Sequence, residues 1–134
     1  MVRLEDWQRR FANYLISKQN EPFVWGKNDC VLFGAGALES ITGVNLYAGQ
    51  PKYKTEMGAK KLLKKLGGIE KLLIDRLGSG HRNALLARRG DIVLVKAPLM
   101  TVGVVDDTGQ RIALVYKDGL IRVPLTSAWR VWSY

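Results

Sequence analysis

The hydrophobic pattern of this chain changes once, near Gly90, and that change limits the folds that it can adopt. Before it, apolar residues recur three or four positions apart, as they do along the buried side of an amphipathic helix. After it come five short runs rich in β-branched residues, DIVLVKA, MTVGVVDD, RIALVYKD, LIRVPL and AWRVWSY, separated by PL, DDTG, KDG and TS. We therefore predict one α+β domain over residues 1–134, with a helical half at 1–80 and a strand half at 90–134.

The same pattern predicts how the two halves combine. Helices are expected at residues 4–16, 28–42, 56–66 and 69–77, packed on one side of the strands. The KDG triplet is typical of a tight hairpin turn. Five short strands with tight turns predict an antiparallel sheet that is either strongly curved or closed into a small barrel.

The second predicted helix is unusually narrow on one side. Asn28 or Asp29 can cap its first turn, and Gly43 is typical of a helix end. Within it, the stretch at residues 34–37 reads GAGA, although glycine inside a helix costs up to about 1 kcal/mol relative to alanine. Another element must pack closely against this side, and the strands of the second half are the simplest candidate.

Cys30 is the only cysteine, which excludes an internal disulfide and every metal site built from several cysteines. We expect no metal and no cofactor. The chain begins with a mixed-charge segment rather than a secretory signal, and it has no apolar stretch as long as the roughly 18 residues that a membrane span needs. These features predict folding in a reducing cytoplasm without a membrane span.

The charge balance is 21 Lys and Arg residues against 12 Asp and Glu residues, a formal net charge of +9. Such an excess favours contact with something anionic, such as an acidic protein, a cell-wall polymer, a lipid surface or nucleic acid. A solvated helix surface that keeps the protein soluble explains it equally simply. The sequence contains no nucleic-acid recognition motif. The basic residues that concentrate the charge are Lys60, Lys61, Lys64, Lys65, Arg88 and Arg89.

The position of Cys30 allows two interpretations. The first turn of a helix favours negative charge, which lowers a thiol pKa and helps to form the nucleophilic thiolate. Free cysteine is also among the most buried residue types, and a narrow helix can enclose one as an inert core residue.

The segment at residues 23–43, FVWGKNDCVLFGAGALESITG, resembles the nucleophile segment of the NlpC-like branch of the papain-fold cysteine peptidases. It is more similar still to a group of small phage-tail proteins related to that branch. The shared motifs occur in the same order along nearly the whole chain: WGxxDCxxF at 25–33, TG at 42–43, LGG at 66–68, GL at 119–120, VPL at 123–125 and AWRV at 128–131.

The resemblance implies a papain-like fold in which Cys30 is the nucleophile, and Trp25 and Asp29 belong to the substrate cleft. In active members of the family the general base is a histidine at the start of the second strand. RGDIVLVKAPLMTVGVVDD matches that region, but Thr101 stands at the histidine position, and a threonine hydroxyl does not accept a proton near neutral pH. The family triad has a third polar residue near the start of RIALV, and Gln110 is the candidate for that position here. His81, the only histidine, lies in the GSGH loop and could replace the base only if that loop moved to Cys30.

Three functions follow, from different classes. The resemblance and the missing histidine favour a phage tail-tip protein, a virion component or assembly factor that keeps a peptidase-like fold without its activity. Its partners would be other phage tail proteins, with peptidoglycan as a further contact. It would be made in the host cytoplasm and then located in the virion tail. The alternative is an active cysteine hydrolase, a peptidoglycan endopeptidase or amidase with Cys30 as nucleophile. The second alternative is a basic nucleic-acid-binding protein.

Overall fold

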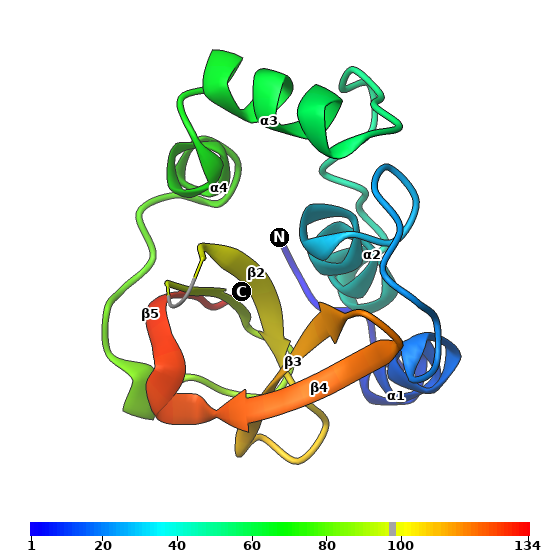
Figure 1. The fold of residues 1–134 in the computed structure, drawn as a ribbon. Coiled ribbons are helices and arrows are strands. Elements are labelled where there is room, and N and C mark those ends of the chain that lie inside the picture. The colour runs from blue at the N-terminus through cyan, green and yellow to red at the C-terminus, as the bar shows by residue number, and fades with distance from the viewer. Residues whose placement is uncertain (97–98) are drawn as a thin grey trace.

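The computed structural model describes residues 1–96 and 99–134, and Figure 1 shows helices followed by a sheet. The predicted turn at Pro98 lies outside the described residues. Over the described residues the chain forms four α-helices, two short 3-10 helices and five strands. Their bounds are α1 Trp7–Lys18, α2 Cys30–Thr42, α3 Glu56–Lys65, α4 Ile69–Leu77, η1 Ala84–Leu86, β1 Ile92–Val95, β2 Thr101–Val105, β3 Arg111–Tyr116, β4 Gly119–Pro124, η2 Leu125–Ser127 and β5 Ala128–Trp132.

The five strands form one antiparallel sheet in the order β4-β3-β2-β1-β5. This confirms the predicted α+β class and the five-stranded antiparallel sheet. The predicted hairpin turn is also confirmed, because Tyr116 pairs with Gly119 across the two residues that separate β3 from β4. The alternative of a small barrel is wrong. Strands β4 and β5 lie at opposite edges of the sheet, because β5 returns to pair with β1 and not with β4.

Helix α2 begins at Cys30, two residues later than predicted, while its cap at Asp29 and its end before Gly43 agree with the prediction. The Asp29 side chain accepts a hydrogen bond from the backbone N–H of Leu32, and Gly43 ends the helix in the left-handed region at φ 77°. Helix α1 starts later than the pattern suggests, at Trp7. The reason is that Leu4 lies outside the helix and donates its backbone N–H to the carbonyl of Ile41, near the end of α2.

The narrow side of α2 is explained by two different neighbours. A Cβ on Gly34 would lie 2.6 Å from a methyl group of Val102 in β2, so the predicted close contact with the strands is confirmed there. A Cβ on Gly36 would lie 2.3 Å from the hydroxyl of Tyr14 in α1. That hydroxyl donates a hydrogen bond to the carbonyl of Phe33, so α1 approaches the α2 backbone directly. The two glycines therefore allow β2 and α1 to approach α2 closely.

Two apolar clusters cover the two faces of the sheet. The larger joins α1, α2 and α4 to β1, β2, β3 and β5 through side chains such as Phe11, Phe33 and Leu94. The smaller lies on the opposite face, where Val93, Val105 and neighbouring residues pack beneath the two 3-10 helices. Both faces are thus occupied, which accounts for the continuous burial of β1. Among the described residues, no helix is long and apolar enough to cross a membrane.

Candidate functional site

Asp29, the residue before Cys30, fixes the start of α2 through hydrogen bonds of its side chain. Its Oδ1 accepts from the backbone N–H of Leu32 at 3.0 Å, and its Oδ2 accepts from the backbone N–H of Gly26 at 3.0 Å and from the Tyr53 hydroxyl at 2.5 Å. The residue is 1% exposed and does not line the pocket in front of the thiol. Burial, together with the hydrogen bond to this carboxylate, raises the pKa of the Tyr53 hydroxyl. The family resemblance implies a place in the substrate cleft for Asp29, whereas its observed contacts are those of a buried helix cap.

The structure brings Cys30, Trp25 and Thr101 to one open pocket between the start of α2 and the start of β2. The Trp25 ring packs edge-on against Phe23, with 4.8 Å between the ring centroids. The Thr101 hydroxyl donates to the carbonyl of Leu99 at 3.1 Å. The remaining lining is mostly apolar and comprises Phe23, Leu99, Met100, Val115, Tyr116 and Lys117. The residues that the sequence singles out at 25, 30 and 101 are therefore neighbours in space.

The environment of Cys30 keeps its thiol protonated. Burial raises the pKa of the Cys30 thiol to about 11, and the negative charge of Asp29 adds to that effect. The nearby backbone of Val102 lowers the pKa of this thiol, but by less than burial raises it. The favourable field expected at a helix start is therefore outweighed. At neutral pH the group is a thiol, not a thiolate.

The described lining of this pocket contains no histidine and no carboxylate that could take the thiol proton. Thr101 carries a hydroxyl only, and the Lys117 side chain is a hydrogen-bond donor without an acceptor. The chemistry that the pocket can carry out unaided is therefore binding through apolar and aromatic contacts, and not general base catalysis.

His81 lies elsewhere, fixed beside strand β5. Its backbone N–H donates to the carbonyl of Val131 at 2.9 Å, and its carbonyl accepts from the Val131 N–H at 2.7 Å. Its ring Nδ1 accepts from the backbone N–H of Asn83 at 3.2 Å. A Cβ on Gly80 would lie 2.4 Å from the Val131 carbonyl oxygen, so glycine at this position permits a close approach to β5. The structure does not bring His81 to the Cys30 pocket.

Gln110 is not brought to the pocket either. It precedes β3, whose beginning pairs with the end of β2 through Val105 and Ile112. Thr101 begins β2 and thus lies at the other end of that strand. Because antiparallel strands run in opposite directions, a residue before β3 cannot meet a residue that starts β2.

The basic residues form two groups that line different hollows. Lys60, Lys61 and Lys64 line a groove on α3 beside the exposed Met57, and Lys65 follows in the last turn. Lys60 forms an ion pair with Glu56 at 3.2 Å. Arg88 and Arg89 line a separate hollow with residues of the N-terminal segment and Tyr134. The concentration of charge seen in the sequence is therefore divided over two surfaces.

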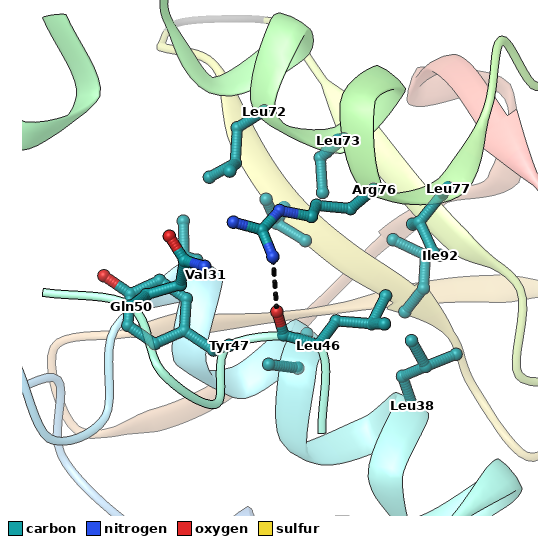
Figure 2. A pocket seen from close by; sticks show the side chains of 13 residues that line it. Val31, Leu38, Leu46, Tyr47, Gln50, Leu72, Leu73, Arg76, Leu77 and Ile92 are labelled. Carbon is teal, nitrogen blue, oxygen red and sulfur yellow. Dashed lines mark hydrogen bonds between the residues drawn. The ribbon is translucent and has the colours of Figure 1, made fainter. Parts of the chain in front are cut away.

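A further cavity, missed by the sequence analysis, lies between α2 and α4 and is shown in Figure 2. Its walls are almost entirely apolar, and the guanidinium of Arg76 crosses it to donate to the carbonyl of Leu46 at 3.3 Å. At about 40 Å³ it can hold only a few water molecules. It is a gap in the packing beside the small residues Gly34 and Ala35, and that pair was the only signal of it in the sequence.

Taken together, the fold and the site define an α+β domain with one partly buried thiol at a helix start, in the same pocket as the first residue of a central strand. The chain belongs to the family described as a domain of unknown function, DUF6950, whose match covers residues 2–134. No curated protein and no solved structure matches it. Among the described residues no group of three or more His, Cys, Asp or Glu side chains could hold a metal ion.

Proposed function

We propose that this chain is a phage tail protein, a tail-tip component or an assembly factor, with an NlpC-like papain fold that has lost hydrolase activity. The support from the sequence is the order of motifs from Trp25 to Val131, which resembles small phage-tail proteins related to that branch of peptidases. Its partners would then be neighbouring tail proteins. It would act in the virion tail after synthesis in the host cytoplasm, with contact to peptidoglycan during entry as a secondary possibility.

One observation carries the proposed loss of activity: Cys30 shares its pocket with Thr101, which stands at the position where the resembling enzymes have their histidine. A cysteine hydrolase needs a base that takes the thiol proton and later returns it to the leaving group. The described pocket offers none, and burial holds the pKa of the Cys30 thiol at about 11. Trp25, the aromatic residue of the resembling motif, lines the same pocket as Cys30.

Genetics in a phage that encodes this chain tests the proposal. We expect deletion of the gene to prevent the formation of infectious tails. Complementation with Cys30→Ala should restore plaque formation to within a few-fold of the unaltered gene, because the thiol performs no chemistry. Mass spectrometry of purified tails would then separate a virion component from an assembly factor that leaves.

Two results would contradict the proposal. Normal tails and normal infection after deletion would remove the tail function. If the Cys30→Ala phage were as defective as the deletion, with the variant protein folded and present in normal amount, the thiol would be essential. That result would favour the alternative function, an active cysteine hydrolase.

A further inference from the structure

A hollow away from the Cys30 pocket gathers three arginines and two aromatic rings. Arg3, Arg88 and Arg89 line it together with Trp7 and Tyr134, and the turn between β2 and β3 closes one side. It shares no lining residue with the Cys30 pocket. The residues come from the two ends of the sequence and from the loop before β1, so the folded structure alone assembles them.

The charge of Arg3 is already balanced within the protein. Its guanidinium donates to Oδ1 of Asp91 at 3.0 Å, and Asp91 is fully buried. The other carboxylate oxygen of Asp91 accepts from the backbone N–H of Arg88 at 2.8 Å and from the Ser133 hydroxyl at 2.7 Å. The guanidinium of Arg3 also lies 4.3 Å from the centre of the Trp7 ring and 5.0 Å from that of Tyr134. The Arg3 side chain is therefore held in place at one side of the hollow and is not free to pair with a ligand.

Arg88 and Arg89 are different, because nothing in the described structure neutralises them. Both are exposed, and neither guanidinium forms an ion pair or hydrogen bond with a described residue. The Arg89 guanidinium lies 5.6 Å from the centre of the Trp7 ring. A Cβ on Gly109 would lie 3.2 Å from the Arg89 side chain, so the stem of Arg89 is held against this turn. No acidic residue lines the hollow, so the guanidinium charges of Arg88 and Arg89 are exposed to solvent near the rings of Trp7 and Tyr134.

We propose that this hollow docks carboxylate side chains of an acidic segment of a partner protein. Guanidinium groups pair with carboxylates through two parallel hydrogen bonds, and an arginine held against an aromatic ring loses less freedom when it does so. Arginine, tryptophan and tyrosine are also the residues enriched at the energetic centres of protein–protein interfaces. A hollow flanked by ring faces suits one or two acidic side chains better than the phosphate track of a nucleic acid, which needs an extended basic stripe. The proposal does not depend on the function proposed for the Cys30 pocket.

The test uses the full chain labelled with ¹⁵N and an acetylated, amidated hexaglutamate peptide, so that side chains supply the carboxylates. We expect titration to shift the indole N–H signal of Trp7 and the backbone signals of residues 88 and 89. The dissociation constant in Arg88→Gln/Arg89→Gln should rise at least about tenfold, because the two guanidiniums that meet the carboxylates are gone. These substitutions keep the side-chain stems, and a thermal melt checks that the variant is folded.

The matched control is Lys60→Gln/Lys61→Gln, which removes the same net charge from the α3 groove. Its affinity for hexaglutamate should stay within about twofold of the unaltered protein. Equal weakening in the two variants would mean unspecific attraction to a basic protein and would overturn the proposal. Hexathymidylate binding to the same signals more tightly than hexaglutamate would also overturn it, because the ligand would then be a phosphate and not a carboxylate.

Discussion

Thr101→His should turn the Cys30 thiol into a reactive thiolate at neutral pH. Thr101 begins β2 and lines the same pocket as Cys30, and the backbone of the next residue, Val102, already lowers the pKa of the thiol. An imidazolium there would stabilise the thiolate directly. We expect the pKa of the Cys30 thiol, about 11 in the unaltered protein, to fall to roughly 7.5 or below.

The size of the effect follows from two opposing terms. Such a fall gives roughly 2,000-fold more thiolate at pH 7, while the less basic thiolate is intrinsically a weaker nucleophile. The net gain in the rate of alkylation by iodoacetamide at pH 7 should be about 50-fold. Thr101→Asn is the control, because an amide fills similar space but does not titrate. Equal alkylation rates in the two variants would show that position 101 does not face the thiol, against the pocket described above.

Asp29→Ala should be the most destabilising change near the site. It removes the cap of α2 and leaves the Gly26 N–H and the Tyr53 hydroxyl without their acceptor. Loss of a cap costs about 1 kcal/mol and a buried donor without a partner about 1–3 kcal/mol, so we expect the free energy of unfolding to fall by about 2–4 kcal/mol. Urea denaturation followed by tryptophan fluorescence measures it.

Thr55→Ala provides the comparison, because Thr55 also caps a helix. Its hydroxyl accepts from the Gly58 N–H at 3.0 Å, but the residue is exposed. Removing it should cost about 1 kcal/mol or less. If the two variants lost the same stability, Asp29 would be only a helix cap, and its buried contacts to Gly26 and Tyr53 would contribute nothing.

The parts of the fold that local sequence governs could be predicted. The start and end of α2 follow from Asp29 and Gly43, whose side-chain and backbone preferences act within one helical turn. The five strands follow from runs of β-branched residues between turn signals. The order of the strands could not be read in the same way, because the pairing of β5 with β1 joins residues far apart in the chain and decides between an open sheet and a barrel.

The sequence predicted which residues lie at the candidate site but not the raised pKa of the Cys30 thiol. The resemblance to the peptidase family implied that Trp25, Cys30 and Thr101 share one pocket, and the structure has them lining one. The raised pKa of Cys30 depends on burial beneath residues of other elements, which no local pattern reveals. The attachment of His81 to Val131 is likewise a contact between distant segments, so the loop that appears flexible in sequence is held to β5.

Alkylation of the unaltered protein as a function of pH tests the central claim most directly, because Cys30 is its only thiol. The rate of reaction with iodoacetamide would be followed from about pH 6 to pH 11.5, with circular dichroism at each pH to confirm that the protein remains folded, and the thiolate pKa fitted. An unperturbed thiol titrates near 8.5, and the urea-unfolded protein supplies that reference. We expect the folded protein to titrate near 11, about 2.5 units above the reference. A midpoint at or below the reference value would show an activated nucleophile and would contradict the proposed loss of hydrolase activity.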